Sequence, residues 1–210
     1  MSPNYPKSLT PYLRMPHVES GQRIGLFGGS FNPPHRGHVH VCEQALRKLE
    51  LSQIWWLVSP GNPLKDHANL APLQDRIEAC EAIATNPKMV ITACEASLPT
   101  RYTADTLSHI VSRNPTIDFV WVMGADNLGQ FHKWERWREI AALLPIVVVD
   151  RRGSTMALHS AMAAQALRPF KIDESDAVLL PTMRPPAWTF LHGPRNLLSS
   201  TQIRENQQKR

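Results

Sequence analysis

From residue 23 onward, short runs of apolar residues alternate with longer segments of helical period. Nearly continuous apolar runs are typical of parallel strands that are buried on both faces. We expect such strands at residues 24–27, 54–58, 89–91, 119–123 and 146–149. Two later runs, at residues 178–180 and 188–191, are interpreted as further strands or extended segments.

The segments between these runs place their apolar residues on one helical face. The clearest stripe consists of Val41, Cys42, Ala45, Leu46 and Leu49. Further helices are expected around residues 73–83, 107–111, 134–144 and 156–167, with Pro145 ending the third. Strands that alternate with helices predict an α/β fold, in which a doubly wound parallel sheet forms the middle of a three-layer sandwich. The ligand site of such a fold lies at the carboxyl ends of the strands.

Length and composition narrow the class of protein. A chain of 210 residues, 42% apolar and 20% charged, fits a single globular domain, which we place at residues 23–210. Residues 1–22 contain four prolines and are predicted to be a flexible N-terminal extension. The net charge of +5 is mild, and no apolar run approaches the roughly 20 residues that span a bilayer. We therefore expect a cytoplasmic protein whose partners are small molecules, not nucleic acid or membrane.

A glycine- and histidine-rich turn follows the first predicted strand. It reads G-G-S-F-N-P-P-H-R-G-H over residues 28–38 and leads directly into a helix. Glycines let backbone N–H groups approach a ligand, and a helix start offers unpaired donors, so the turn predicts a phosphate site. His35 and His38 would hydrogen-bond polyphosphate oxygens there. Two alternatives remain open: zinc ligation by His35, His38 and His40, or a purely structural histidine pair.

This turn resembles the G-G-x-F-D-P-x-H-x-G-H signature of the nucleotidylyltransferase superfamily, whose two histidines bind a nucleoside triphosphate. Residues 198–204, L-S-S-T-Q-I-R, are similar to the superfamily's second signature, I-S-S-T-x-I-R. Asn32 and Leu198 stand where Asp and Ile are commoner. Ser199 and Ser200 also fit an ordinary helix cap.

The middle of the chain resembles the bacterial nicotinate-nucleotide adenylyltransferase family. Residues 123–137 carry its G-A-D-N-L and F-H-x-W letters, residues 102–107 carry Y-T-x-D-T-L, and residues 62–65 occupy the place of its N-x-P-x-K loop. The resemblance implies a Rossmann-like nucleotidylyltransferase fold. It also implies transfer of the adenylyl group of ATP to nicotinate mononucleotide in NAD biosynthesis, with Mg²⁺ accompanying ATP and no resident metal site.

By resemblance, the residues divide into three groups. The catalytic group is His35, His38 and Arg204. The ATP-binding group is Gly28, Gly29, Ser30, Phe31, His35, His38, Gly124, Asp126, Ser199, Ser200, Thr201 and Arg204. The acceptor-binding group is Asn62, Lys65, Tyr102, Thr103, Trp134 and Arg152.

Plainer interpretations stay open for several of these residues. Asp126 and Asn127 fit a helix cap, Trp134 fits core packing, and Lys65 fits a solvated side chain. For the whole protein, the alternatives are an adenylyltransferase that uses nicotinamide mononucleotide or a pantetheine phosphate, or a nucleotide-binding module without catalysis.

Overall fold

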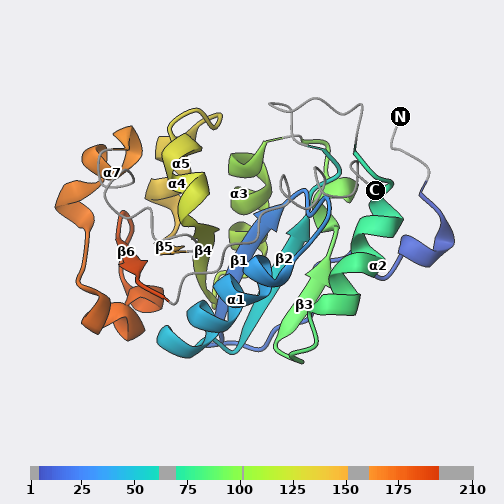
Figure 1. The fold of residues 1–210 in the computed structure, drawn as a ribbon, viewed down its shortest axis with the longest axis horizontal. Helices are drawn as coiled ribbons and strands as arrows, with labels where there is room; N and C mark the ends of the chain where they lie inside the picture. The colour runs from blue at the N-terminus through green and yellow to red at the C-terminus, as the bar shows by residue number, and fades with distance from the viewer. Residues whose placement is uncertain (1–4, 62–69, 101, 151–160, 194–210) are drawn as a thin grey trace, which may run out of the picture.

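A six-stranded parallel sheet forms the centre of the molecule. The computed structural model describes residues 5–61, 70–100, 102–150 and 161–193. Across the sheet the strands follow the order β3-β2-β1-β4-β5-β6, and every neighbouring pair is parallel (Figure 1). The strands are β1 (Arg23–Gly29), β2 (Gln53–Val58), β3 (Met89–Thr92), β4 (Asp118–Gly124), β5 (Ile146–Val149) and β6 (Trp188–Leu191). All five strands expected from the sequence are present, and residues 188–191 add the sixth.

Helices cover both faces of this sheet, which confirms the predicted three-layer sandwich (Figure 1). One face carries α1 (Arg36–Lys48), α2 (Leu73–Ile83) and the 3₁₀ helix η4 (Glu174–Thr182). The opposite face carries α3 (Thr103–Arg113), α4 (Ala125–Phe131), α5 (Trp137–Leu143) and α7 (Met162–Ala166). Shorter 3₁₀ helices are η1 (Lys7–Leu9), η2 (Cys94–Ser97) and η3 (Arg168–Phe170). Successive strand residues alternate between the two cores: Trp56 packs under α1 and α2, and Trp55 packs under α3.

The strand order reverses between β1 and β4. The chain first proceeds outward from β1 to β3, then returns through α3 to place β4 on the other side of β1. The helices that follow β1 and β4 therefore leave the sheet on opposite faces. In doubly wound sheets this reversal opens the ligand site at the carboxyl ends of the two strands. The turns after Gly29 and Gly124 begin at those ends.

Three local expectations are corrected. Residues 178–180 lie in η4 instead of a strand, because Pro181 has no N–H for a ladder and Leu179 turns outward, 56% exposed. The helix expected from Trp134 begins at Trp137, because Arg136 adopts the left-handed conformation with φ of 55° and separates α5 from α4. The helix expected over residues 156–167 is α7, Met162–Ala166, and residues 151–160 lie outside the described part.

Residues 5–22 pack against the outer edge of the sheet, whereas the sequence suggested a flexible extension. Leu9 is buried in the core beneath α1 and α2. The Tyr12 carbonyl accepts hydrogen bonds from the backbone N–H of Ala93 at 2.7 Å and from Oγ1 of Thr92 at 3.0 Å. The prolines exclude a long α-helix but leave apolar side chains and carbonyls for the sheet edge, which the sequence alone did not reveal. The boundary at residues 22 and 23 stays a prediction.

None of the helices in the described ranges is long and apolar enough to cross a membrane.

Candidate active site

Aromatic packing explains the two glycines that end β1. A Cβ on Gly28 would lie 2.5 Å from Cη2 of Trp121, and a Cβ on Gly29 would lie 3.1 Å from Cζ of Phe31. No side chain fits at Gly28 without displacing the Trp121 indole. The following Phe31 has φ of 45°, is buried, and stacks on Trp56 with ring centroids 5.0 Å apart. Any contact of Phe31 with ATP would therefore come from its backbone.

His35 and His38 cap the start of α1 reciprocally. His35 is the N-cap residue, and its Nδ1 accepts a hydrogen bond from the backbone N–H of Gly37 at 3.1 Å. In return, Nδ1 of His38 accepts a hydrogen bond from the backbone N–H of His35 at 3.1 Å. The two rings lie 3.9 Å apart between centroids. This is the geometry of a capping box, with histidines in place of the usual Ser and Glu.

The cap assigns the protons of both rings. A ring nitrogen that accepts a hydrogen bond carries no proton, so each neutral imidazole holds its proton on Nε2. Both rings are thereby set as Nε2–H donors. Protonation at Nδ1 would break a bond of the cap. The pair suits the donation of hydrogen bonds to anionic oxygen and does not suit the removal of a proton through Nδ1.

The same geometry bears on the two open alternatives for these histidines. The structural interpretation is correct in part, because the Nδ1 atoms do cap a helix. The zinc interpretation gains no support, since a ring nitrogen that carries a proton cannot bind zinc, and the cap occupies each Nδ1 and leaves the proton of each neutral ring on Nε2. Within the described ranges, no three His, Cys, Asp or Glu side chains gather as a metal site.

Three aromatic side chains pack around the ring of His38. Its ring lies edge-on to Phe31 at 5.1 Å between centroids, and Phe27 and Trp56 follow at 6.0 Å and 6.2 Å. The core beneath α1 therefore restrains the orientation of His38 before any ligand is present.

The turn after β4 is built differently. Gly124 is the N-cap of α4, and this helix start receives no side-chain cap. Asp126 lies in the first turn of α4 with its side chain exposed. The interpretation of Asp126 and Asn127 as helix caps is therefore wrong. A carboxylate at the carboxyl end of β4 faces outward instead.

Trp134 lies between the two interpretations made for it. It is half-buried, and its indole meets Trp121 at 6.1 Å and Phe131 at 5.5 Å between centroids, both edge to face. Such contacts fix the ring without covering it completely. Trp121 thus touches both Trp134 and the position where a Gly28 side chain would be.

A salt bridge joins the turn after Trp134 to the start of α3. Arg136 contacts Asp105 in the first turn of α3 and also Glu139 in α5. Tyr102 is the N-cap residue of α3, with 45% of its surface exposed, and Thr103 is the first residue of the helix. The ion pair therefore holds Trp134, Tyr102 and Thr103 in one region of the molecule, as an acceptor site would require.

Glu95 is a buried carboxyl that the sequence did not single out. It is 9% exposed, and Oγ1 of Thr106 donates to its Oε2 at 3.3 Å. Burial raises the pKa of Glu95, against the opposing effect of hydrogen bonds from Ser59 and Thr106. The residue links the end of β2 to α3. Its only signal in the sequence was a single charge between two apolar residues, Cys94 and Ala96.

Seven of the predicted site residues lie outside the described ranges, so their roles stay predictions. They are Asn62, Lys65, Arg152, Ser199, Ser200, Thr201 and Arg204.

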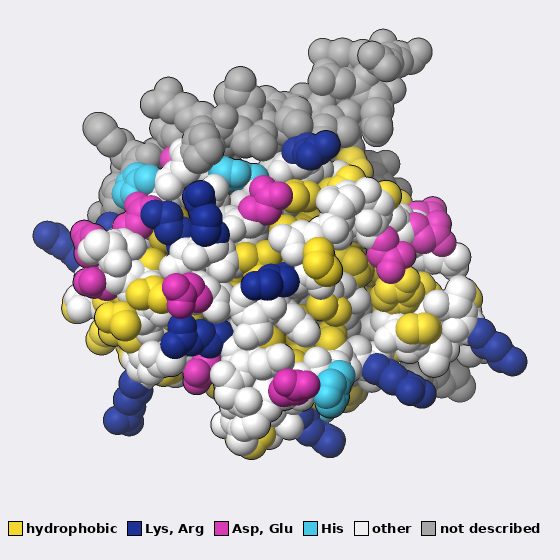
Figure 2. Space-filling view, turned by 90° about the horizontal axis from the view of Figure 1, so that it is seen from below, with side chains coloured by type: hydrophobic (Ala, Val, Ile, Leu, Met, Phe, Trp, Pro, Cys, Tyr) yellow, Lys and Arg dark blue, Asp and Glu magenta, His cyan; other side chains and the backbone are white. Residues whose placement is uncertain are grey.

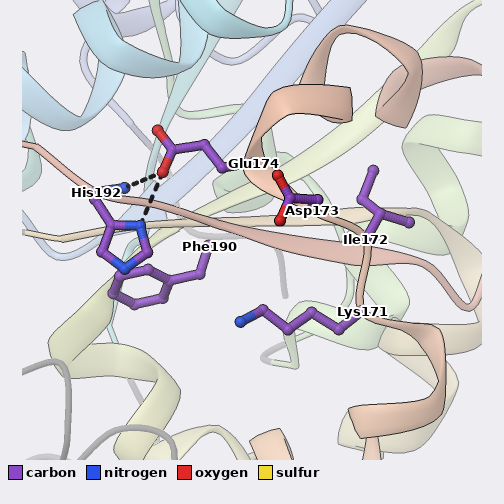
Figure 3. A pocket seen from close by; sticks show the side chains of 6 residues that line it. All are labelled: Lys171, Ile172, Asp173, Glu174, Phe190 and His192. Atoms are coloured by element: carbon purple, nitrogen blue, oxygen red, sulfur yellow. Dashed lines mark hydrogen bonds and ion pairs between the residues drawn. The ribbon is translucent and has the colours of Figure 1, made fainter.

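An open pocket of about 420 Å³ lies elsewhere, at the edge strand β6 (Figure 3). Its Glu174 accepts hydrogen bonds from Nδ1 of His192 at 2.8 Å and from the His192 backbone N–H at 3.1 Å, and it pairs with Lys48 at 3.3 Å. Partial burial alone would raise the pKa of Glu174, but these partners lower it overall. The carboxylate thus joins η4, β6 and α1. Its hydrogen bonds and its ion pair give this carboxylate a structural role.

Seen from below, the molecule shows charges of both signs among apolar side chains (Figure 2). Lysines and arginines are interspersed with aspartates and glutamates on this face, without a continuous stripe of one sign. A polyanion would therefore find no uniform attraction on this face.

Known proteins resemble the chain over nearly its full length. Residues 26–206 match the family model described as cytidylyltransferase-like. A relative from Mesorhizobium japonicum, named "Probable nicotinate-nucleotide adenylyltransferase", is 57% identical over 191 residues, which are 91% of this chain and 98% of the relative. A relative of the same name from Agrobacterium fabrum is 55% identical over 183 residues, 87% of this chain and 98% of the relative.

Solved structures share the fold. Plasmodium falciparum nicotinic acid mononucleotide adenylyltransferase complexed with NaAD superposes with a TM-score of 0.65 at 20% identity, covering 88% of this chain and 83% of that chain. The same protein complexed with APC gives a TM-score of 0.63 over the same shares. These similarities confirm the Rossmann-like architecture inferred from the sequence.

Proposed function

Because the chain belongs to the nicotinate-nucleotide adenylyltransferase family, we propose that it transfers the adenylyl group of ATP to nicotinate mononucleotide. The products are nicotinate adenine dinucleotide and pyrophosphate, and the reaction serves NAD biosynthesis. The observation that carries this proposal at the site is the reciprocal cap of His35 and His38 after the carboxyl end of β1, which leaves the proton of each neutral ring on Nε2.

The reaction needs donors more than it needs a base. A phosphate oxygen of nicotinate mononucleotide forms a bond to the α-phosphorus of ATP. The bond from that phosphorus to the bridging oxygen breaks, and its electron pair leaves with pyrophosphate. The attacking phosphate is already charged at neutral pH, so catalysis consists of positioning and of stabilising the charge that develops on the leaving group. Imidazoles fixed as donors serve that purpose.

On the ATP side, the donors of His35 and His38 would face the triphosphate, with Arg204 as a third catalytic group. Gly28 and Gly29 end β1 and Ser30 begins the turn that follows, so their backbone would contact a neighbouring oxygen. Ser199, Ser200 and Thr201 would complete this side through the second signature. The fixed orientation of His38 supports the assignment, because a donor that needs no reorganisation is the more effective one.

On the acceptor side, Trp134 would stack on the pyridine ring. Tyr102 and Thr103 at the start of α3 would donate to its carboxylate. Their common region, held by the pair of Arg136 with Asp105, supports this role. Asn62, Lys65 and Arg152 would contact the phosphate of the mononucleotide.

Mg²⁺ would accompany ATP. The outward carboxylate of Asp126 is a hard oxygen ligand of the type Mg²⁺ takes, and Mg²⁺ bound to nucleotides commonly uses one or two carboxylates together with phosphate oxygens. When bound, the ion would neutralise part of the triphosphate charge.

A product assay tests the proposal. The purified chain is incubated with ATP, Mg²⁺ and one acceptor at a time: nicotinate mononucleotide, nicotinamide mononucleotide or a pantetheine phosphate. We expect nicotinate adenine dinucleotide by mass spectrometry, with pyrophosphate released in equal amount. A faster reaction with either of the other acceptors would overturn the assignment, and ATP binding without pyrophosphate release would indicate a binding module.

A further inference from the structure

Arg76 is a buried cation on the apolar face of α2. It is 2% exposed and lies on the same helical stripe as Leu73, Ile77 and Cys80. Arginine is rarely buried so completely unless a carboxylate faces it. None of the ion pairs formed by the described residues includes Arg76. Arg76 is not among the residues predicted from the sequence, although an arginine on the apolar stripe of a helix is itself a signal.

Backbone carbonyls take the place of a carboxylate. Nη1 of Arg76 donates to the Ser30 carbonyl at 2.8 Å and to the Ser59 carbonyl at 2.7 Å. Nη2 reaches the Pro60 carbonyl at 3.4 Å, and Nε donates to the Ala71 carbonyl at 2.9 Å. The rigid fork of a guanidinium can serve this many acceptors at once, which the ammonium of lysine cannot do in the same geometry.

The four carbonyls belong to the segments that surround the proposed site. Ser30 lies in the turn between β1 and the histidine pair, and Ser59 and Pro60 follow β2. Ala71 precedes α2, and its N–H also donates to Oδ1 of Asn32 at 3.3 Å. One side chain therefore joins the ATP-side turn to both ends of the segment 61–70, which contains the predicted acceptor residues Asn62 and Lys65.

The charge of Arg76 is not cancelled by these partners. Carbonyl oxygens satisfy its donors but carry no net charge. Burial lowers the pKa of Arg76, yet a guanidinium keeps its proton throughout the working pH range. A buried positive charge with no carboxylate partner among the described residues favours an anion nearby, and both substrates of the proposed reaction are anionic phosphates.

We propose that Arg76 is a positioning residue, which sets the distance between the ATP-side turn at Ser30 and the chain at Ser59, Pro60 and Ala71. The inference rests on the proposed function for its kinetic consequence but not for its structural one. We call the four hydrogen bonds of Arg76 the Arg76 clamp. Displacement of a substrate by about 1 Å can cost about 10²-fold in rate, so loss of the clamp would slow the reaction although Arg76 contacts neither substrate.

Three variants test the clamp: Arg76→Met, Arg76→Lys and Ile77→Val. Arg76→Met removes the charge and the fork, and we expect kcat/KM to fall about 100-fold, chiefly through a higher KM for nicotinate mononucleotide. Arg76→Lys keeps the charge and should recover about 10-fold of that loss. Ile77→Val alters the adjacent buried side chain, so it serves as the destabilised control and should change neither KM by more than about twofold.

Hydrogen exchange of the unliganded protein gives a readout that does not depend on activity. Peptides covering residues 28–34 and 57–61 should exchange faster in both Arg76 variants than in wild type, and should exchange at the wild-type rate in Ile77→Val. If Arg76→Met does not fold, Arg76→Lys decides alone. The clamp is overturned if both segments exchange as in wild type, or if KM stays constant while activity follows the folded fraction. If wild type makes no dinucleotide, the proposed function fails and exchange still decides the clamp.

Discussion

The two turns at the reversal of the sheet contrast strongly, although each joins a central strand to a helix. After β1, α1 starts with a reciprocal histidine cap, and aromatic rings hold His38 from behind. After β4, α4 starts at Gly124 without a side-chain cap, and Asp126 points outward. The first turn has its donors fixed by the chain itself, whereas the second leaves polar groups exposed. The β1 side therefore has the restrained donors that the proposed triphosphate site needs, and the β4 side offers the exposed carboxylate that is proposed to accompany Mg²⁺.

Removal of Mg²⁺ should have the largest effect, because hydrogen-bond donors alone do not neutralise the charge of a triphosphate. We expect EDTA to abolish pyrophosphate release and added Mg²⁺ to restore it. The measurement is a coupled pyrophosphate assay with a titration of metal. Recovery with zinc alone would contradict this division and would return the histidines to a metal-ligating role.

His38→Ala tests the turn after β1 directly. It removes one donor to the developing charge and leaves the backbone N–H of His35 without its acceptor, so kcat/KM should fall roughly 10²- to 10³-fold, about 3–4 kcal/mol. The matched control is His40→Ala on the same helix, which should keep activity within about threefold. Turnover near the wild-type value in His38→Ala would remove the catalytic role of the pair.

Trp134→Ala tests the proposed acceptor side, in the segment that follows α4. We expect KM for nicotinate mononucleotide to rise about 10-fold, the order of a lost stacking contact, with KM for ATP nearly unchanged. Trp134→Phe keeps a ring and should recover part of the affinity. Equal effects on both KM values would mean that Trp134 supports the core beneath both substrates.

Glu95→Gln should have the smallest effect, on stability and not on either KM. Burial raises the folded-state pKa of Glu95 above its ordinary value of 4.5. Its contribution to stability is therefore complete below that value and is lost as pH rises through the folded pKa. The glutamine variant stays neutral, so its unfolding free energy should decline less than that of wild type from about pH 5 to about pH 8. Chemical denaturation at each pH measures this, and a decline equal to that of wild type would contradict it.

Much of the fold was predictable because strands that are buried on both faces consist of nearly continuous runs of apolar residues. Three predictions of local structure failed, each for a physical reason of its own. Residues 178–180 have the letters of a strand, but Pro181 and the outward Leu179 belong to η4. The break at Arg136 depends on a positive φ that no letter encodes. The edge contacts of Tyr12 use backbone carbonyls, which every sequence supplies.

The site was predictable to a smaller extent. The histidine motif identified His35 and His38, and their spacing of three residues equals the spacing of a capping box, so the reciprocal cap was readable in principle. Arg76 was missed because it stands beside Asp75 and Glu78 and looks like a solvated charge of a helix, and Glu95 was missed because it is a single charge between Cys94 and Ala96. Their partners are backbone or hydroxyl groups far away in sequence.

The absence of a side chain at Gly28 ties the two halves of the site together. Because a methyl group there would lie 2.5 Å from the Trp121 indole, that ring would have to shift, and it contacts Trp134 on its other side. A substitution at Gly28 is therefore transmitted through Trp121 to Trp134, the residue proposed to hold the pyridine. Attempts to alter the choice of nucleoside triphosphate at this strand end would also retune acceptor preference, and the two specificities would have to be selected as a pair.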